Sequence, residues 1–481
     1  MSAEIRPARS EESAGSSDKQ MRATIISAVS NLSTAYNLVN VNLTNEIMSN
    51  QFCGGDNCKA SVATTTTACL AGAIFGQLTF GYVGDWLGRG PALYLTMVMS
   101  IAGALVSAFA VPLNPRDPTT VFIFLSIARF ILGVGVGGVY PLAATVAAEG
   151  SSSENRGRSV ALVFSMQGVG QLLVPVVGML CLYSFGDGVT ETKTLMNVKG
   201  LSWRLILGLG ALPGMLLMPF QRNQNSSETR VDTSQMPSMI QALSNRAYWR
   251  SILGCAGGWF LFDITFYGNT LFSPAILRDV FHVPEHSHAP VIGDDLQHNL
   301  CWQLAILALL GLPGYYVSVC FMDRAGRKNI QIQGFAMMAL LYAILAAFLE
   351  KMEDLPATLL FVYGLTYFFS NFGPNSTTFI LPSESFPWEV RSSLNGFCAA
   401  MGKFGAVVGS SMFLPLKAAY GPSFVFVCCA ICAMLGIIIT VFCIDDRRGQ
   451  DMMGEGEVSL SSARDDPFGE ASQSECSGSR R

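Results

Sequence analysis

Two short stretches, GYVGDWLGRG (residues 81–90) and FMDRAGRKN (residues 321–329), decide the fold of this chain. In both, an aspartate stands three residues before a Gly-Arg pair, and apolar runs flank the stretch. The matching residues are Asp85, Gly88 and Arg89 in the first stretch and Asp323, Gly326 and Arg327 in the second, which also contains Arg324. A soluble turn can contain such an ion pair, but its recurrence between apolar runs indicates a chain made of two similar halves.

The composition predicts a membrane protein. Hydrophobic residues make up 50% of the 481 and charged residues only 13%, against roughly a quarter in soluble domains. A helix needs about 20 apolar residues to cross a bilayer, and the sequence offers twelve such runs. We expect them at 22–47, 61–83, 91–111, 120–147, 158–184, 201–220, 250–276, 299–320, 330–349, 356–380, 392–416 and 422–444. Nothing points to nucleic acid, and we expect no metal or cofactor.

The repeated motif also predicts the domain organisation. Each copy lies between the second and third run of a group of six, so the chain divides into two six-helix bundles. We predict a disordered tail at 1–21, a bundle at 22–220, a linker at 221–249, a bundle at 250–444 and a disordered tail at 445–481. This all-α architecture is typical of secondary transporters, which bind substrate near the midplane between the halves, and not of an enzyme.

Arginine and lysine predict the orientation in the membrane. In the short loops these residues fall on even-numbered connections, which places those loops in the cytosol. They are Arg89, Arg156, Arg158, Arg324, Arg327, Lys328 and Arg391. Twelve crossings then leave both termini cytoplasmic. We expect a multi-pass monomer in the lipid of the plasma membrane.

Two charged residues, Asp263 and Lys403, lie inside expected membrane runs. A lone charge there is costly, so each should face a partner or a polar cavity. Neighbouring runs supply groups that can hydrogen-bond the oxygens of a small tetrahedral anion, namely Tyr140, Gln167, Trp259, Tyr267, Asn371 and Asn375. In the alternative interpretation the two charges form a structural ion pair between the halves, and the aromatic residues contribute only packing. The asparagines then satisfy backbone groups at the Gly373-Pro374 break.

Several segments resemble a known family. The Asp-x-x-Gly-Arg loops, and Arg129 followed by ILGVGVGG, resemble signature patterns of the major facilitator superfamily. Within it, the interior segments resemble the phosphate:proton symporter family. They are GGVYPLAATVAAE, FSMQGVGQLL, WRLILGLGALP, WFLFDITFYG, NFGPNSTTFILPSESFP and AAMGKFGAVVGS. The resemblance implies the major facilitator fold, phosphate as substrate at the polar and charged residues named above, and gating ion pairs that involve Glu149, Glu384 and Arg391.

The chain departs from the family pattern at acidic positions. Val139 stands where the family has an aspartate in GGDYPL, and Thr34 and Asn37 stand at the acids of a stretch resembling DAYDLF. Asp263 is then the one retained interior carboxylate of the pattern, and we expect it to carry the proton. Loss of the acids at these three positions leaves open fewer coupled protons, a facilitator, or sodium bound by the oxygens of the first run.

Three functions fit the sequence. The leading one is a transporter of inorganic phosphate, driven by protons or another cation. A second keeps the fold and changes the cargo to a sugar or another organic anion. The third is a nutrient sensor that binds phosphate without moving it.

Two features of the outer loops remain. Cys53 and Cys58 could pair as a disulfide if their loop faces an oxidising space. Four histidines lie with two aspartates between residues 282 and 298, where a metal site, a pH sensor and an ordinary polar loop are the alternatives.

Overall fold

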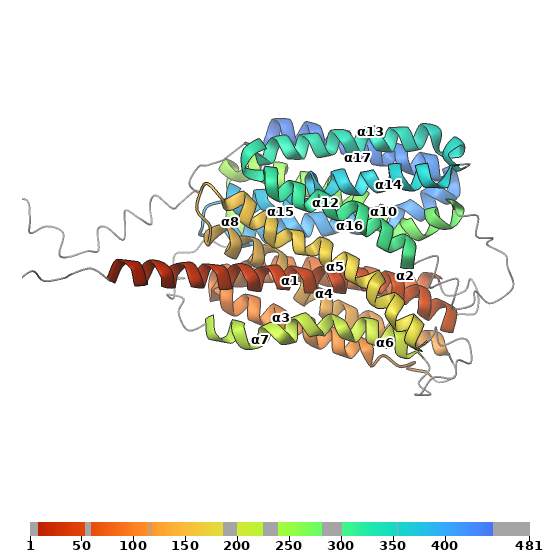
Figure 1. Ribbon diagram of the computed structural model, residues 1–481, viewed down its shortest axis with the longest axis horizontal. Helices are drawn as coiled ribbons and strands as arrows, with labels where there is room; N and C mark the ends of the chain where they lie inside the picture. Colours follow the sequence, from red (N-terminus) through yellow and green to blue (C-terminus); the bar gives the residue numbers. More distant parts are fainter. Residues whose placement is uncertain are drawn as a thin grey trace, which may run out of the picture.

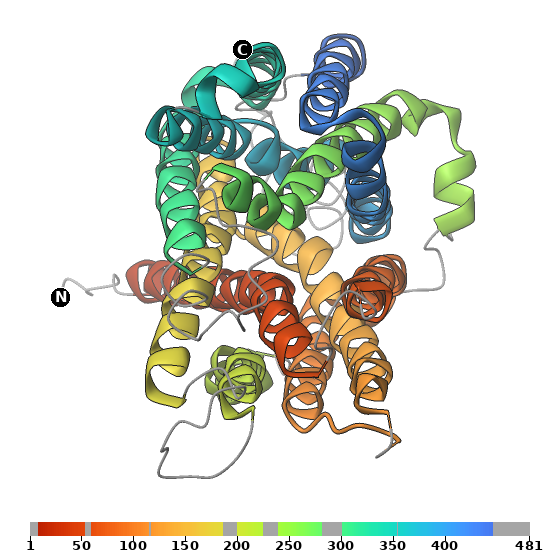
Figure 2. The same ribbon diagram turned by 90° about the vertical axis from the view of Figure 1, so that its right-hand side faces the viewer.

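The computed structural model describes residues 8–52, 59–114, 117–185, 200–224, 239–280, 301–353 and 355–445. Within them the chain is helical, apart from connecting turns and an isolated bridge between Asn114 and Asp117. Helices α1 to α7 gather on one side of the molecule and α10 to α17 on the other (Figure 1, Figure 2). We call these two groups the N-terminal half and the C-terminal half. The structure confirms the expected all-α membrane fold.

The N-terminal half contains six helical segments. They are α1 (Ala8–Phe52), α2 (Lys59–Leu87), α3 (Arg89–Ala108), α4 (Val121–Glu149), α5 (Arg156–Phe185) and a sixth made of α6 (Leu201–Gly208), η3 (Leu209–Ala211) and α7 (Leu212–Gln224). The short 3-10 helix η2 (Pro118–Thr120) leads into α4. Helix α1 projects beyond its neighbours (Figure 1).

The C-terminal half also contains six. The first consists of α9 (Trp249–Ile252), the π-helix η6 (Leu253–Gly257) and α10 (Gly258–Val280). The fourth consists of α14 (Pro356–Asn371) and α15 (Pro374–Ser385). The other four are α12 (Trp302–Ala325), α13 (Arg327–Glu353), α16 (Arg391–Tyr420) and α17 (Pro422–Cys443). Between the halves lie α8 (Met239–Ser244) and η5 (Arg246–Tyr248).

Nine helices in the described part of the chain are long and apolar enough to cross a membrane by themselves. The three segments outside this set contain α1, α10 and the broken pair α14 and α15. Helix α1 buries a series of Asn, Ser and Thr side chains, which lowers its hydropathy. The break after Asn371 follows from Pro374, which has no backbone N–H to donate and clashes with the preceding turn.

The observed boundaries differ from the expected ones in two places. Helix α1 begins at Ala8, within the tail expected to be disordered, because residues 8–21 contain no proline and no β-branched residue to oppose a helix. Part of the expected linker is helical in α8 and η5. Residues 225–238 and 446–481, the pair Cys53 and Cys58, and the four loop histidines lie outside the described residues.

The glycines of helix α4 allow it to contact α2 directly. A Cβ on Gly133 would lie 2.2 Å from the carbonyl oxygen of Cys69, and one on Gly137 would lie 2.2 Å from that of Ala73. Only glycine tolerates such an approach at two successive turns of one face. Close packing of α2 on α4 therefore accounts for two of the four glycines in residues 133–149.

The two halves meet where α2 packs on α16 and α5 packs on α12. Both contacts run toward the face that carries residues 85–89 and 323–327. We call it the motif face, and the other end of the molecule the opposite face.

Candidate functional site

Asp263 and Lys403 form a buried ion pair. The Lys403 Nζ lies 2.9 Å from Asp263 Oδ2, and each side chain is only 2% exposed. Asp263 lies on α10 and Lys403 on α16, so both belong to the C-terminal half. The alternative of an ion pair between the halves is therefore wrong in its placement, because the two helices pack on each other inside one half.

Aromatic rings surround the Lys403 charge. Its Nζ lies 4.3 Å from the ring centroid of Tyr267 and 5.2 Å from that of Tyr140. Both distances fall in the range of cation–π attraction. Tyr140 comes from α4, so this ring brings the N-terminal half to the pair. The Lys403 charge thus lies at the boundary between the halves.

The Trp259 indole packs against Gly402 on the facing helix α16. A Cβ on Gly402 would lie 2.5 Å from the Trp259 indole, so only glycine leaves room for it beside Lys403. Trp259 and Asp263 stand four residues apart on α10 and so share the face that packs on α16.

Asn371 and Asn375 belong to a polar chain inside the C-terminal half. Asn375 Nδ2 donates to Asn371 Oδ1 at 2.7 Å and to the Tyr315 hydroxyl at 2.8 Å, while Asn371 Nδ2 donates to the Gly311 carbonyl at 2.9 Å. The carbonyl of Asn371, freed by the helix break, accepts instead from the hydroxyls of Ser318 and Ser376. The asparagine side chains are thus not the groups that satisfy the break.

Two of the expected residues keep unpartnered polar atoms in the interior. The Tyr140 hydroxyl lies near that of Tyr267 but has no partner in hydrogen-bond geometry, and Gln167 Oε1 has none either. Buried polar atoms are normally satisfied, so these two groups have capacity for a ligand or for water. Val139 beside Tyr140 is buried and apolar, and it adds no charge here.

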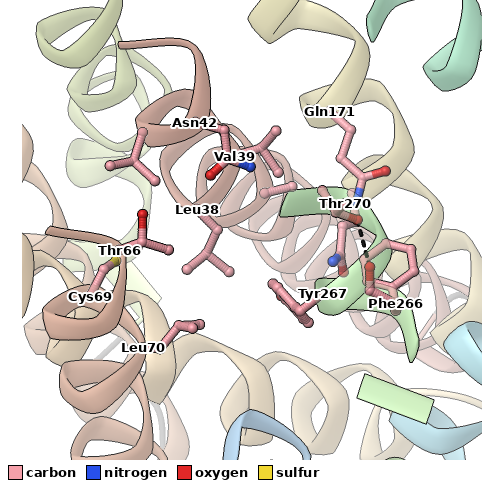
Figure 3. A pocket seen from close by; sticks show the side chains of 13 residues that line it. Leu38, Val39, Asn42, Thr66, Cys69, Leu70, Gln171, Phe266, Tyr267 and Thr270 are labelled. Atoms are coloured by element: carbon pink, nitrogen blue, oxygen red, sulfur yellow. Dashed lines mark hydrogen bonds between the residues drawn. The ribbon is translucent and has the colours of Figure 1, made fainter. Parts of the chain in front are cut away.

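Two adjoining cavities lie toward the opposite face. The first, of about 450 Å³, is lined by residues of α1, α2, α5 and α10 that include Asn42, Cys69, Gln167 and Tyr267 (Figure 3). The second, of about 780 Å³, shares Asn42 and Gln171 with the first and extends to Asn371. Because the Tyr267 ring contacts the Lys403 charge and also lines the first cavity, this cavity lies beside the buried ion pair.

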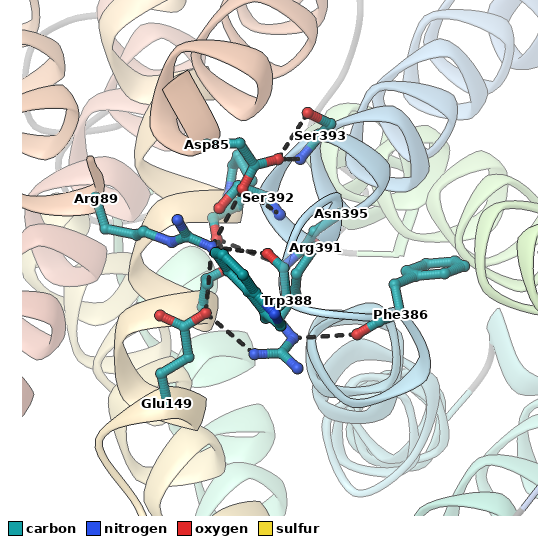
Figure 4. A network of polar contacts seen from close by, with 11 residues as sticks. Asp85, Arg89, Glu149, Phe386, Trp388, Arg391, Ser392, Ser393 and Asn395 are labelled. Atoms are coloured by element: carbon teal, nitrogen blue, oxygen red, sulfur yellow. Dashed lines mark hydrogen bonds and ion pairs between the residues drawn. The ribbon is translucent and has the colours of Figure 1, made fainter. Parts of the chain in front are cut away.

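The motif face is closed by a first ion-pair cluster that joins the halves (Figure 4). Asp85 accepts hydrogen bonds from the backbone N–H groups of Ser392 and Ser393, at 3.3 and 2.7 Å, and so caps the N-terminus of α16. Glu149 contacts Arg89 at 3.3 Å and Arg391 at 3.0 Å. We define this cluster as Asp85, Arg89, Glu149 and Arg391.

A second ion-pair cluster repeats the arrangement with the halves exchanged. Asp323 Oδ2 accepts from the backbone N–H of Arg158, in the first turn of α5, at 2.8 Å. Arg327 contacts Asp323 at 3.0 Å and donates two hydrogen bonds to Glu384, at 2.9 and 2.7 Å. We define this cluster as Asp323, Arg327 and Glu384. Arg324 is part of the same loop.

The glycines of the two loops adopt one conformation. Gly88 has φ 99° and ψ 150°, and Gly326 has φ 86° and ψ 152°. Positive φ with such ψ is essentially restricted to glycine, which explains its place before each arginine.

Arg129 lies far from both clusters, although its sequence context groups it with the signature positions. It is buried in the middle of α4, and its Nη2 donates to groups of α1.

Sequence reasoning missed Tyr315 and Gln77. Tyr315 is buried and joins Asn375, but a tyrosine in an apolar run gives no distinct signal. Gln77 on α2 is buried with both polar side-chain atoms unpartnered, and a glutamine inside AIFGQLTF could have been noticed.

Comparison with known proteins places this architecture in a family. Residues 25–410 match the model of the Major Facilitator Superfamily. Among solved structures, the proton:xylose symporter XylE bound to 6-bromo-6-deoxy-D-glucose superposes with a TM-score of 0.71, 17% identity and coverage of 91% of this chain and 98% of that one. The inward open form of XylE from E. coli gives a TM-score of 0.64 at 17% identity, with coverage of 91% and 99%.

Curated relatives are closer in sequence. Probable inorganic phosphate transporter 1-6 of Arabidopsis thaliana is 34% identical over 444 residues, which cover 82% of this chain and 84% of the relative. Inorganic phosphate transporter PT2 of Toxoplasma gondii is 31% identical over 455 residues, which cover 92% and 77%. The chain therefore belongs to the Major Facilitator Superfamily and, within it, to the family of the inorganic phosphate transporters, so it is a multi-pass membrane transporter and not an enzyme.

Proposed function

We propose that this protein moves inorganic phosphate across the plasma membrane by alternating access, coupled to protons. The observation that carries the proposal is the buried Asp263–Lys403 pair, whose lysine meets the Tyr140 ring of the other half beside a cavity lined by Gln167 and Tyr267. The names of the relatives supply the substrate. A buried lysine supplies the positive charge that an anion needs and a neutral sugar does not.

The ion pair suggests how phosphate and a proton move together. In the empty site, Asp263 balances Lys403. When a phosphate monoanion takes the lysine, two negative groups would share one cation, and uptake of one proton by Asp263 restores the balance. Tyr140, Gln167, Trp259 and Tyr267 donate to or contact the phosphate oxygens, and the Asn371–Asn375 chain holds the neighbouring helices in place.

The access cycle uses both faces of the molecule. The motif face is held closed by the two ion-pair clusters, and we take it, with both termini, to be cytoplasmic. The cavities lie toward the opposite face, so this conformation receives substrate from outside. Rocking of the two six-helix bundles would break the contacts that cross between the halves, namely Glu149–Arg391 and the backbone hydrogen bonds to Asp85 and Asp323, and open the site to the cytosol. No contact between copies is required for this cycle, which suits a monomer.

Uptake into proteoliposomes tests the function. Radiolabelled phosphate should accumulate under an inward proton gradient, and unlabelled sulfate or glucose should compete poorly. A sodium gradient in place of the proton gradient tests the other cation, which the polar oxygens of α1 could bind. Binding without uptake would instead favour a sensor, and competition by glucose would favour a sugar transporter.

Two variants separate binding from coupling. Lys403→Ala should weaken phosphate binding at least about 30-fold, equivalent to roughly 2 kcal/mol for a truncated partner of a buried charge pair. Lys417→Ala, near the end of the same helix, is the matched control. Asp263→Asn should keep phosphate exchange and lose accumulation against a gradient. Normal binding by Lys403→Ala removes the lysine from the site, and normal accumulation by Asp263→Asn removes the proton role of the aspartate.

A further inference from the structure

The N-terminal half contains a second buried cation, Arg129, with different surroundings. Its side chain is 0% exposed in the middle of α4. Its Nη2 donates to the backbone carbonyl of Asn37 at 2.9 Å and to the side-chain oxygen of Asn40 at 2.7 Å. Both acceptors are neutral.

The rest of the guanidinium is unsatisfied. Nε and Nη1 are buried without a hydrogen-bond partner, and in the described part of the chain Arg129 makes no ion pair with a carboxylate. The ionisable groups close enough to feel its charge are the Cys69 thiol and the Tyr36 phenol. The Tyr36 hydroxyl donates to the Ile206 carbonyl.

Three other buried cations among the described residues have carboxylate partners. Lys403 has Asp263, Arg327 has Glu384, and Arg391 has Glu149. A fixed positive charge with two free N–H donors in a low-dielectric interior is costly unless a negative group balances it. An arginine stays charged at any physiological pH, so it cannot lower the cost by losing its proton.

We propose that the unpartnered N–H groups of Arg129 bind a small inorganic anion, chloride or phosphate monoanion, that serves as its counter-ion. Hydrogen bonds from a guanidinium to an anion are strong, and Nε and Nη1 each have an N–H group left to donate. The first cavity lies close by, because Cys69 lines it (Figure 3) and the Cys69 backbone packs against α4 at Gly133, about one turn along from Arg129. This site is separate from the Asp263–Lys403 pair, and its anion need not be transported.

The test uses thermal unfolding of the purified full-length protein in detergent. Two series are measured at constant ionic strength. In the first, chloride replaces gluconate in steps without phosphate. In the second, phosphate replaces gluconate in steps without chloride. A ligand of the folded state alone raises the unfolding temperature with concentration, and we expect a saturable rise of at least about 2 °C. A response to chloride identifies a general anion site, whereas a response to phosphate alone is assigned to Arg129 only where it persists in Lys403→Gln and is lost in Arg129→Met.

Two variants locate the site. Asn40→Asp puts a carboxylate where the amide oxygen now contacts Arg129, so it should raise the unfolding temperature in gluconate and remove the anion response. Arg129→Met removes the charge and should also remove the response. Lys403→Gln is the control and should retain the response to chloride.

Three outcomes would overturn the proposal. In the first, the unfolding temperature of the parent depends on neither anion. In the second, the full response persists in both Arg129→Met and Asn40→Asp. In the third, the response is lost in Lys403→Gln but kept in Arg129→Met. None of these readouts needs transport, so a failure here is distinct from a failure of the proposed function.

Discussion

The two ion-pair clusters of the motif face contain the same kinds of contact, but the acid that is buried in one cluster corresponds to the more exposed acid in the other. In the first cluster the helix-capping acid Asp85 is 5% exposed and Glu149 is 32% exposed. In the second the capping acid Asp323 is 19% exposed and Glu384 is 6% exposed. Equivalent positions of one repeated motif therefore lie in different dielectric surroundings. The free energy of each contact depends on that burial more than on the motif.

The largest difference is expected between Glu384 and Glu149. Glu384→Gln leaves the buried Arg327 without its two charged hydrogen bonds and should cost about 3–5 kcal/mol of stability. Glu149→Gln should cost about 1 kcal/mol, because water can reach its position and solvate the arginines. The midpoint of thermal unfolding measures both, with the exposed Glu154→Gln as control. Equal losses would show that the difference in burial has no energetic consequence.

A smaller difference is expected between the capping acids, which both join the halves. Asp85→Asn should open the motif face about tenfold more often, through loss of buried charged hydrogen bonds, and Asp323→Asn only about twofold. A cysteine in place of Asn395, buried between the halves beside Pro141, reports opening through its rate of maleimide labelling in a background without reactive cysteines. A higher rate of maleimide labelling in Asp323→Asn than in Asp85→Asn would contradict the expectation that Asp85 contributes more than Asp323 to keeping the motif face closed.

No difference is expected between the loop glycines. Gly88→Ala and Gly326→Ala place a side chain in nearly the same unfavourable backbone conformation, so each should destabilise the protein by about 1–3 kcal/mol. Gly150→Ala is the control, because its φ of −79° suits any residue. Unequal unfolding temperatures of the two loop variants would mean that the loops differ in more than the burial of their acids.

Part of the candidate site could be read from the sequence. Asp263 and Lys403 were identifiable because a charge inside an apolar run is rare and costly. The unpartnered state of Tyr140 and Gln167 was not, since tyrosine and glutamine in a helix are compatible with many partners. The absence of an acid next to Arg129 was equally hidden, because Asn37 and Asn40 reveal their position only once α1 packs on α4.

The sequence by itself determined the membrane class, the number of helical segments and the twofold repeat, because apolar run length and a local motif depend on neighbours along the chain. Only the tertiary structure decided which side chains meet. Lys403 finds Asp263 across 140 positions, and Ser393 finds Asp85 across 308. Helical periodicity predicts which residues share a face, but the rotation and depth of each helix against the others are set by packing of the whole bundle. That packing decides whether a given acid is buried or exposed.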